Sequence, residues 1–362
     1  MEKTQSQLVG ATVEAICFDI ERTAAGLAAE HALDSLLVPT IFFGGGTPTF
    51  LAGDDLARIL ATIRAHFPIA SDAEISSEAN PGSSDAAKFA RMREAGFNRL
   101  SIGVQSFDDR LLIALDRFHT SSEAERAFAA ARSAGFDNVN LDLMFGLPGQ
   151  TPSLWEASMR RALELQPEHL SLYALTLEPG TRFERLAAGG KLDLPDEDVE
   201  LAMYERSITS LTAAGLEHYE VSNFARPGFR SRHNQVYWRN EEYLGFGPGA
   251  VSYLDGRRWK RERLPAHYIE KINQHADLAV ESECLDAAGA LGETMMLGLR
   301  LRDGLPLQRV RDRCGVDPLS HFAAQIQRLQ ERGLLVHEAD SLRLTHAGLL
   351  LANDALSDFL PD

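Results

Sequence analysis

Cysteine is scarce in this chain of 362 residues, which contains only Cys17, Cys284 and Cys314. Their wide separation excludes a disulfide framework and a metal site of the CxxC type. We therefore expect each cysteine to be a buried small apolar residue. Around Cys17, the spacing predicts a helix with Ile16, Cys17 and Ile20 on one face.

The chain also lacks long apolar runs and an excess of basic charge. No run approaches the roughly 20 apolar residues that cross a bilayer, and the first residues, MEKTQSQLVG, do not have the order of a signal peptide. A net charge of -16 argues against broad nucleic-acid binding, which depends on lysine and arginine. We expect a cytoplasmic protein that is not an integral membrane protein, with peripheral membrane contact left open.

Strand and helix patterns alternate along most of the chain. Strands are predicted at 40–43, 73–80, 99–106, 138–146, 169–176 and 217–225, and helices between them at 54–67, 84–96, 121–135 and 201–215. Serine, threonine or aspartate opens several helices and glycine closes them, as capping requires. The order predicts an α/β fold with a mainly parallel sheet, either doubly wound or a TIM-type barrel, since periodicity alone does not separate the two.

Polar or glycine exceptions stand at the ends of four successive predicted strands. They are Gly44 to Thr47, Glu78, Gln105, and Asp142 with Gly146. Singly, each has a packing explanation: Glu78 and Asn80 can end a strand before a proline, and Asp142 can cap a helix. Because carboxyl ends of parallel strands meet at one edge of the sheet, the whole set favours a ligand site there.

The glycine stretch GGGTPTF matches neither a P-loop nor a GxGxxG dinucleotide motif. Its bare backbone could instead pair with a small polar ligand such as an amino acid. Glu78 could hold an ammonium group or ribose hydroxyls, and Arg117 a carboxylate. An amino acid joined to a nucleoside would satisfy all three.

Several linked motifs then make a family resemblance specific. GGGTP, EANPG, RLSIGVQSF, NLDLMFGLPGQT, LSLYALTLEPGT and YEVSNFARPGFRSRHNQVYWRNEEYLGFGPGA follow one another across residues 12–360. In order and spacing they resemble the radical S-adenosylmethionine (SAM) family of oxygen-independent coproporphyrinogen III oxidase-like proteins, and most closely its heme chaperone branch. The resemblance implies a partial TIM-type barrel with its first strand missing or degenerate. It also implies a SAM site formed by Gly45, Gly46, Thr47, Glu78, Gln105, Arg117 and Asp142.

The chain departs from that family in one respect. Members carry a CxxxCxxC motif whose thiolates hold a [4Fe–4S] cluster, and no such motif occurs in these 362 residues. Two explanations stay open: a start placed too far downstream, which we favour, or a paralogue that lost its cluster. The chain as written is not expected to cleave SAM reductively, and it offers no catalytic residue and no cluster ligand.

A basic segment surrounds the sequence RHNQVYW, 232–238. From Arg226 to Arg263 there are nine lysines and arginines and four acidic residues, a local excess of +5 in an acidic chain. One interpretation is a site for a large planar anion, with arginines for carboxylates and an imidazole for iron. The other is a solvated basic rim that contacts acidic parts of the protein. The resemblance favours the first, with His233 as axial ligand of heme.

We expect three consecutive parts: a radical SAM-like partial barrel (1–225), a basic heme-binding and connecting segment (226–285) and a small C-terminal helical domain (286–362). In the last part a helix, a hairpin and a final helix predict a winged-helix-like order. Residues 291–362 carry eight arginines and ten acidic residues, so a lid or partner surface is expected rather than DNA binding.

The leading function is thus a protein that binds heme and SAM and delivers heme to acceptor proteins. One rival is an oxidase of porphyrin biosynthesis that decarboxylates coproporphyrinogen III, which would need the cluster. The other is a cluster-free scaffold that binds only a partner protein. A homodimer is left open.

Overall fold

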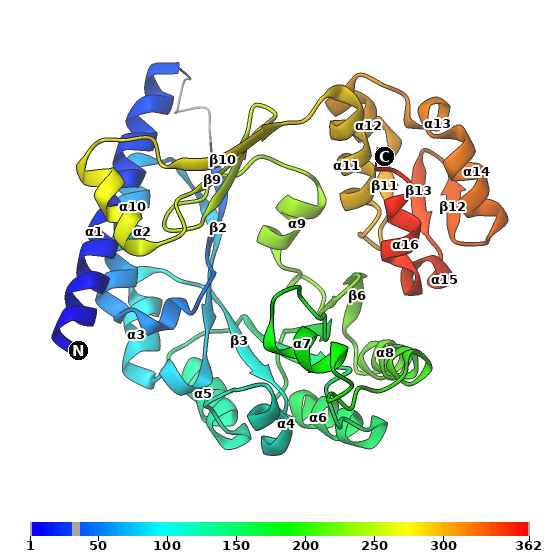
Figure 1. The fold of residues 1–362 in the computed structure, drawn as a ribbon, viewed down its shortest axis with the longest axis horizontal. Coiled ribbons are helices and arrows are strands. Elements are labelled where there is room, and N and C mark those ends of the chain that lie inside the picture. The colour runs from blue at the N-terminus through cyan, green and yellow to red at the C-terminus, as the bar shows by residue number, and fades with distance from the viewer. Residues whose placement is uncertain (1, 31–36, 361–362) are drawn as a thin grey trace. The chain divides into compact units, whose positions relative to one another are not determined.

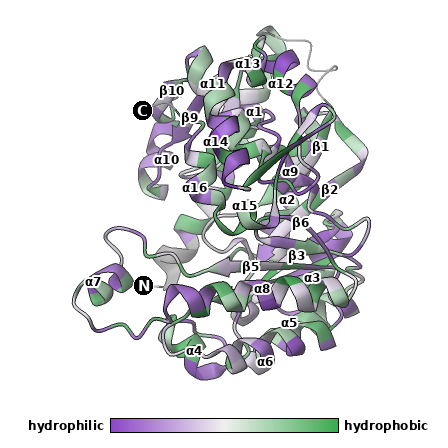
Figure 2. Cartoon of the chain, turned by 90° about the vertical axis from the view of Figure 1, so that its right-hand side faces the viewer, coloured by the Kyte–Doolittle hydropathy of each residue, from purple (hydrophilic) through white to green (hydrophobic). Residues whose placement is uncertain are grey.

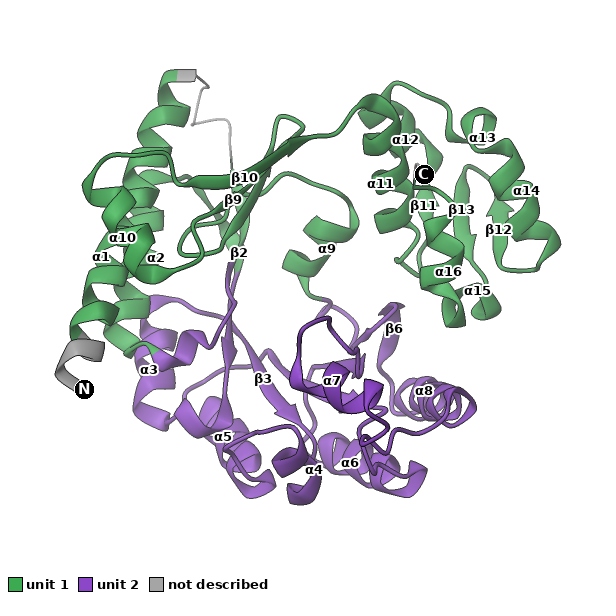
Figure 3. Ribbon diagram, viewed as in Figure 1, with its two compact units in different colours: residues 1–41, 51–74, 231–362 green, residues 42–50, 75–230 purple. Residues whose placement is uncertain are grey.

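A computed structural model describes residues 2–30 and 37–360 of the chain. The chain folds into two compact units, each discontinuous in sequence (Figure 3). Unit 1 comprises Met1–Ile41, Leu51–Glu74 and Ser231–Asp362, and unit 2 comprises Phe42–Phe50 and Ile75–Arg230. The sequence predicts consecutive segments instead, because local patterns do not reveal that the first helices pack with the C-terminal half.

A seven-stranded sheet runs through most of the predicted strands (Figure 1). Its order is β1-β2-β3-β4-β5-β7-β6, with bounds β1 Val38–Phe43, β2 Ile69–Ala79, β3 Arg99–Gln105, β4 Val139–Phe145, β5 His169–Ala174, β6 Glu217–Glu220 and β7 Asn223–Ala225. Strands β2 to β5 are parallel neighbours, joined by the crossovers that parallel pairing demands. This confirms the partial barrel.

One predicted strand is wrong. The run at 217–225 forms two short strands, β6 and β7, which pair with each other in antiparallel register. Val221 and Ser222 make the turn between them, and β7 pairs antiparallel with β5. The run shows strand propensity throughout and contains no glycine or proline, so no local signal marks this reversal.

Each helix of unit 2 begins after an aspartate or threonine whose side chain caps it. These helices are α3 Ala86–Ala95, α4 Asp109–Ala114, α5 Ser121–Ser133, α6 Pro152–Glu164, α7 Arg182–Ala188 and α8 Glu197–Ala213, with single 3-10 turns at Pro48–Phe50 and Pro81–Ser83. Thr120 and Glu123 form a reciprocal capping box at the start of α5. Gly96 closes α3 in the left-handed conformation with φ 102°. Hydrophilic and hydrophobic residues alternate around helices such as α8, which buries Met203 and Leu211 (Figure 2).

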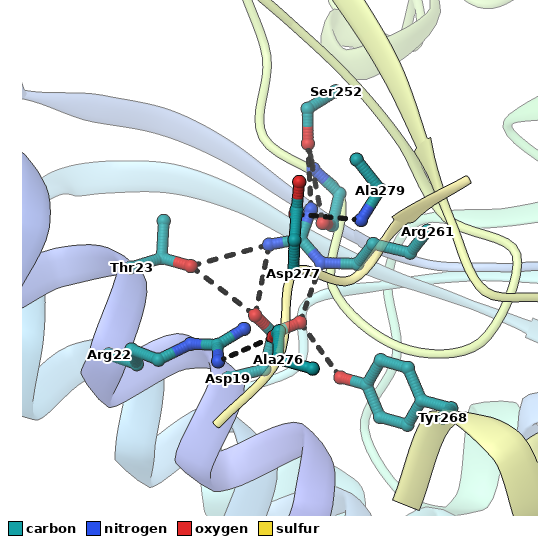
Figure 4. A network of polar contacts seen from close by, with 10 residues as sticks. Asp19, Arg22, Thr23, Ser252, Arg261, Tyr268, Ala276, Asp277 and Ala279 are labelled. Atoms are coloured by element: carbon teal, nitrogen blue, oxygen red, sulfur yellow. Dashed lines mark hydrogen bonds and ion pairs between the residues drawn. The ribbon is translucent and has the colours of Figure 1, made fainter. Parts of the chain in front are cut away.

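Unit 1 contains α1 Glu2–Glu30, α2 Gly53–His66, α9 Arg232–Trp238 and α10 Pro265–Asn273, with a three-stranded sheet of β8 Val251–Leu254, β9 Arg257–Arg261 and β10 Ala279–Cys284. A buried ion pair ties α1 to β9: Arg261 Nε donates to Asp19 Oδ2 at 2.6 Å (Figure 4). The Tyr268 hydroxyl of α10 donates to the same oxygen at 2.8 Å, and Arg261 Nη1 donates to Ser252 Oγ at 3.1 Å. Both charges of this network have partners, so it fixes three elements together.

The C-terminal part of unit 1 confirms the predicted helix, hairpin and final helix. Its elements are α11 Ala287–Gly298, β11 Leu305–Pro306, α12 Leu307–Cys314, α13 Pro318–His321, α14 Ala323–Glu331, β12 Leu335–Glu338, β13 Ser341–Leu344, α15 His346–Leu350 and α16 Ala352–Ser357. Strands β12 and β13 form an antiparallel hairpin after α14. Within 2–30 and 37–360, no helix has both the length and the apolar character needed to cross a membrane.

The three cysteines do not share one environment. Cys17 is buried with Val13 and Ile20 on α1, as predicted. The prediction is wrong for Cys284, which is exposed at the end of β10, and Cys314 is half-buried. Residues 279–284 form a strand with little cover on either face, which the run AVESEC does not indicate.

Candidate functional site

The glycine loop after β1 leaves its backbone open. Gly45 and Gly46 have φ of 81° and 62°, a left-handed conformation that glycine adopts without strain. A Cβ atom at either position would meet nothing within 4 Å. The Gly45 N–H donates to Glu78 Oε2 at 3.2 Å, which links the loop to the end of β2. Thr47, the third predicted member, is half-buried in the same loop.

Glu78 and Asp142 form the acidic part of this site. Burial raises the pKa of Glu78, the charge of Asp142 raises it further, and the Gly45 N–H opposes both. Burial also raises the pKa of Asp142, against hydrogen bonds from Asn140, Ser171 and Ser101. These two partly buried carboxyl groups repel each other. A bound cation, or a ligand with several hydroxyl donors, would relieve this repulsion.

Gln105 ends β3 in an unusual backbone conformation. Its φ is 65°, rare for a residue with a side chain, and the register with β4 shifts between Gly103 and Gln105. Such bulges are common beside ligand sites, where they turn a side chain away from the regular pleat. The Gln105 Nε2 atom lies 3.0 Å from the position that a Cβ of Gly103 would occupy, so the side chain folds back over that glycine.

Arg117 stands apart from this group. It lies half-buried between α4 and α5, with its backbone N–H bonded to Leu112 O at 2.9 Å. Burial lowers the pKa of His119, and the charge of Arg117 lowers it further. Among the described residues, no hydrogen bond or ion pair joins Arg117 to Glu78, Gln105 or Asp142. The structure thus brings together the glycine loop, Glu78 and Asp142, but shows no direct contact of Arg117 with them.

His233 is held on three sides. It lies in the first turn of α9, where its backbone N–H donates to Glu74 Oε1 at 3.0 Å. Its Nδ1 lies 2.9 Å from Thr40 Oγ1, and its Nε2 lies 3.0 Å from the Tyr237 hydroxyl. Any metal that uses Nε2 must therefore displace Tyr237.

The tautomer of His233 follows from its neighbour. Burial raises the pKa of Tyr237 to about 12, so the phenol keeps its proton and is able to donate to Nε2 of His233. In that arrangement Nδ1 carries the ring proton and donates to Thr40 Oγ1. The neutral imidazole then presents the lone pair of Nε2 toward Tyr237, which is the electron pair that iron would use.

Much of the basic segment is paired with carboxylates inside the protein. Ion pairs join Arg230 to Glu217, Arg232 to Asp72, Arg258 to Glu283 and Glu293, Lys260 to Glu281 and Arg261 to Asp19. For these five residues, the ion pairs favour the second interpretation of the basic segment, a rim that contacts acidic parts of the protein. Arg239, Arg257 and Arg263 have no carboxylate partner within 37–360.

A set of polar residues on β3, β4 and β5 was not predicted from the sequence. Besides Asp142, it contains Arg99, Asn140 and His169, all buried. The sequence does contain a signal for this set, because polar residues occupy alternate positions of strands whose other positions are apolar. In the described part of the chain, by contrast, no group of three or more His, Cys, Asp or Glu residues is arranged to hold a metal ion.

Comparisons with known proteins agree with this architecture. Residues 27–162 match the model of the radical SAM superfamily, and residues 285–351 match the HemN C-terminal domain. Heme chaperone HemW of Bacillus subtilis is 40% identical over 89% of this chain and 85% of its own length. Heme chaperone HemW of Escherichia coli is 38% identical over 90% and 85%.

Two further relatives extend the comparison. The mouse mitochondrial protein called radical S-adenosyl methionine domain-containing protein 1 is 35% identical over 90% of this chain and 76% of its own length. The solved structure of coproporphyrinogen III oxidase HemN from Escherichia coli, described as a radical SAM enzyme, superposes with a TM-score of 0.81 at 24% identity, covering 97% of this chain and 83% of that one. This last likeness shows the fold. The chain therefore belongs to the HemW family and carries the radical SAM and HemN C-terminal domains.

Proposed function

We propose that this protein binds heme and SAM and delivers the heme to acceptor proteins. The observation that carries the proposal is the similarity to proteins named heme chaperone HemW, at 35–41% identity in bacteria as distant as Bacillus subtilis and Mycobacterium tuberculosis. It extends over 89% and 91% of this chain for those two species, so it includes both the glycine loop and α9.

SAM would be held at the carboxyl ends of β1 to β4. The open backbone of Gly45 and Gly46, with Thr47 beside them, accepts a close approach of the methionyl group. Glu78 and Asp142 supply the acceptors that an ammonium group, a sulfonium centre or ribose hydroxyls need, and Gln105 adds an amide. Arg117 would take the carboxylate after a change of side-chain rotamer. SAM, when bound, supplies a sulfonium cation to a site with two acidic groups.

The residues present do not fit an iron–sulfur cluster. The sequence has three cysteines, and they lie in different elements: α1, the end of β10 and the end of α12. A [4Fe–4S] cluster in this family takes three thiolates. These residues therefore support no radical step.

Heme would be taken by His233 as cargo. In the tautomer described above, Nε2 carries no proton, so its lone pair is the one that would bind iron. The Tyr237 ring lies edge-on beside the imidazole. Arg239, which lies six residues further along the chain and has no carboxylate partner among the described residues, would bind a propionate.

The test is a spectral titration of the protein with heme. His233→Ala should weaken heme binding at least tenfold and alter the Soret band, whereas His267→Ala, at an exposed position of α10, should leave both unchanged. Transfer is then followed by adding apomyoglobin as a generic acceptor. Absence of any saturable Soret change in the wild-type protein would favour a scaffold without heme, and protoporphyrinogen formation with release of carbon dioxide would favour the oxidase.

A further inference from the structure

Tyr237 presents its hydroxyl at the exposed side of the His233 ring. The imidazole is half-buried, and its Nδ1 lies 2.9 Å from Thr40 Oγ1 on the more buried side. Its Nε2 lies 3.0 Å from Tyr237 Oη on the exposed side, and the Tyr237 side chain is 36% exposed. A metal complex that arrives from solvent therefore meets a hydrogen-bonded pair of atoms, Oη and Nε2, and not a bare imidazole.

The two atoms of this pair differ in what they offer a metal. In the tautomer described above, the single lone pair of His233 Nε2 accepts the proton of the phenol, so it binds iron only after that hydrogen bond breaks. Tyr237 Oη donates its proton, but no group among the described residues donates a hydrogen bond to it. The lone pairs of the phenol oxygen are thus open to a metal while the contact with His233 stays in place.

Binding through the phenol oxygen requires an acceptor for its proton. His233 Nε2 is that acceptor, since transfer along the 3.0 Å hydrogen bond gives a phenolate and an imidazolium. The imidazolium keeps its hydrogen bond from Nδ1 to Thr40 Oγ1. Glu74 is buried and accepts the backbone N–H groups of Arg232 and His233 at 3.0 Å each, so its negative charge lies beside the imidazolium.

The charge of the iron decides between the two atoms. Without a metal the phenol keeps its proton, but a bound cation reverses that preference and favours the deprotonated ligand. Ferric iron is the harder and more highly charged ion, and a phenolate neutralises the extra charge of ferric heme, as the tyrosine ligand does in catalase. A neutral imidazole leaves that charge in place and suits ferrous heme.

We propose that Tyr237 binds the iron of ferric heme through its phenolate oxygen, with His233 as the acceptor of its proton. The proposal rests on the proposed function, because heme is the cargo, and it leaves His233 Nε2 as the ligand of ferrous heme. When ferric heme binds, the iron–oxygen bond forms, the O–H bond breaks and the proton moves to Nε2, with no change in oxidation state. Both side chains belong to one face of α9, four residues apart.

The first experiment identifies the ligand in the wild-type protein. Ferric heme is titrated into the protein, and resonance Raman spectra are excited in the phenolate-to-iron charge-transfer band. Vibrations of an iron-bound phenolate should be enhanced, and they should shift when the protein carries ring-deuterated tyrosine. Saturable heme binding without these vibrations would overturn the proposal and leave the proposed function standing. Absence of saturable heme binding would count against both.

The second experiment separates a ligand from a mere competitor. If Tyr237 only competes with iron for His233 Nε2, Tyr237→Phe should tighten the binding of ferric and ferrous heme alike. If Tyr237 is the ferric ligand, Tyr237→Phe should weaken ferric heme binding at least tenfold and abolish the phenolate vibrations. Ferrous heme, measured under dithionite, should bind the variant as tightly as the wild-type protein or more tightly. Unchanged or tighter binding of ferric heme would contradict the proposal.

The reduction potential of the bound heme is an independent readout. A tenfold loss of affinity confined to the ferric form raises a one-electron potential by about 59 mV, so Tyr237→Phe should raise it by at least that amount. A structural defect would weaken both oxidation states equally and leave the potential where it is in the wild-type protein. That outcome, too, would overturn the assignment of Tyr237 as a ligand.

Tyr243→Phe is the matched control. The centroid of the Tyr243 ring lies 4.9 Å from that of Tyr237, in edge contact, so the variant removes a neighbouring hydroxyl and leaves the His233–Tyr237 pair intact. Its heme affinities, potential and phenolate vibrations should match those of the wild-type protein. Should Tyr237→Phe fail to fold, as judged by circular dichroism, the Raman experiment on the wild-type protein still decides the matter.

Discussion

Arg261 and Arg99 are equally buried, each 3% exposed, but their surroundings differ. Arg261 in unit 1 makes two hydrogen bonds to Asp19, at 2.6 and 3.1 Å, and a third to Ser252. Arg99 in unit 2 begins β3, and its Nε is buried without a hydrogen-bond partner. Polar side chains of β3, β4 and β5, such as Ser101, Asn140 and His169, are bonded to one another rather than to it. A buried charge that is fully paired within the chain holds the elements of a fold together. A buried polar group without a partner lowers stability, and such costs are typical of functional sites.

The largest effect is expected at the paired arginine. Arg261→Met leaves the Asp19 carboxylate buried without its counter-charge, and should lower the free energy of unfolding by about 3–5 kcal/mol. Urea unfolding followed by circular dichroism measures the change. Arg257→Met, on the same strand but exposed, should shift it by less than about 0.5 kcal/mol. Similar losses for both variants would mean that the ion pair is not what fixes α1.

The unpaired arginine should respond in the opposite direction. Arg99→Met removes a side chain whose buried Nε has no hydrogen-bond partner, so the free energy of unfolding without ligand should rise, by about 1–3 kcal/mol. The same urea experiment applies. A decrease as large as that of Arg261→Met would show that Arg99 has a structural partner and would remove the contrast between the two residues.

Glu78 extends the comparison to an acid. Glu78→Gln should weaken SAM binding roughly tenfold or more, yet raise the free energy of unfolding at neutral pH by about 0.5–2 kcal/mol. The gain arises because burial raises the pKa of Glu78 above 4.5 in the folded state. Equilibrium dialysis and urea unfolding supply the two readouts, with Glu94→Gln on the exposed surface of α3 as the control.

The pH dependence gives the sign of this effect. With its pKa raised, folded Glu78 binds more protons than the unfolded chain, so its contribution to stability improves as pH falls from the raised value toward 4.5. The gain in free energy of unfolding of Glu78→Gln over the wild-type protein should therefore shrink as the pH is lowered through this window. An advantage that stays constant would show that the charge of Glu78 is not its cause.

Two glycines provide the smallest contrast. Gly45→Ala forces a side chain into the left-handed region and should cost about 1–2 kcal/mol. Gly10→Ala lies in the helix α1 with nothing near its Cβ and should add about 0.5–1 kcal/mol. Thermal unfolding of the two variants measures both changes, and equal signs would contradict the assigned role of the loop conformation.

Local pattern was enough to predict much of the fold. The strands β1 to β5, the helices α1, α2, α3, α5 and α8 and the position of the glycine loop follow from period, capping and glycine content, and the structure confirms them. The reversal at Val221 was missed because it has no turn residue. The exposure of Cys284 was missed because burial depends on which elements cover a strand.

The site was less predictable for a physical reason. His233 meets Thr40, 193 positions away in the chain, and Arg261 meets Asp19, 242 positions away. The charge count around RHNQVYW could not show that five of its basic residues already have acidic partners. Arg99 begins the motif RLSIGVQSF, but only the folded arrangement shows that its Nε is buried without a hydrogen-bond partner.

The hydrogen bond from Tyr237 to His233 has a consequence for delivery. A carrier must release its cargo as well as bind it, and under the proposed function the Tyr237 phenol would compete with iron for the lone pair of His233 Nε2. If His233 holds heme iron as proposed, the Tyr237 hydroxyl would be the group that returns to Nε2 after the iron has left. The proposed heme site would thus include its own competing ligand for the imidazole, which would favour release of heme at some expense in affinity.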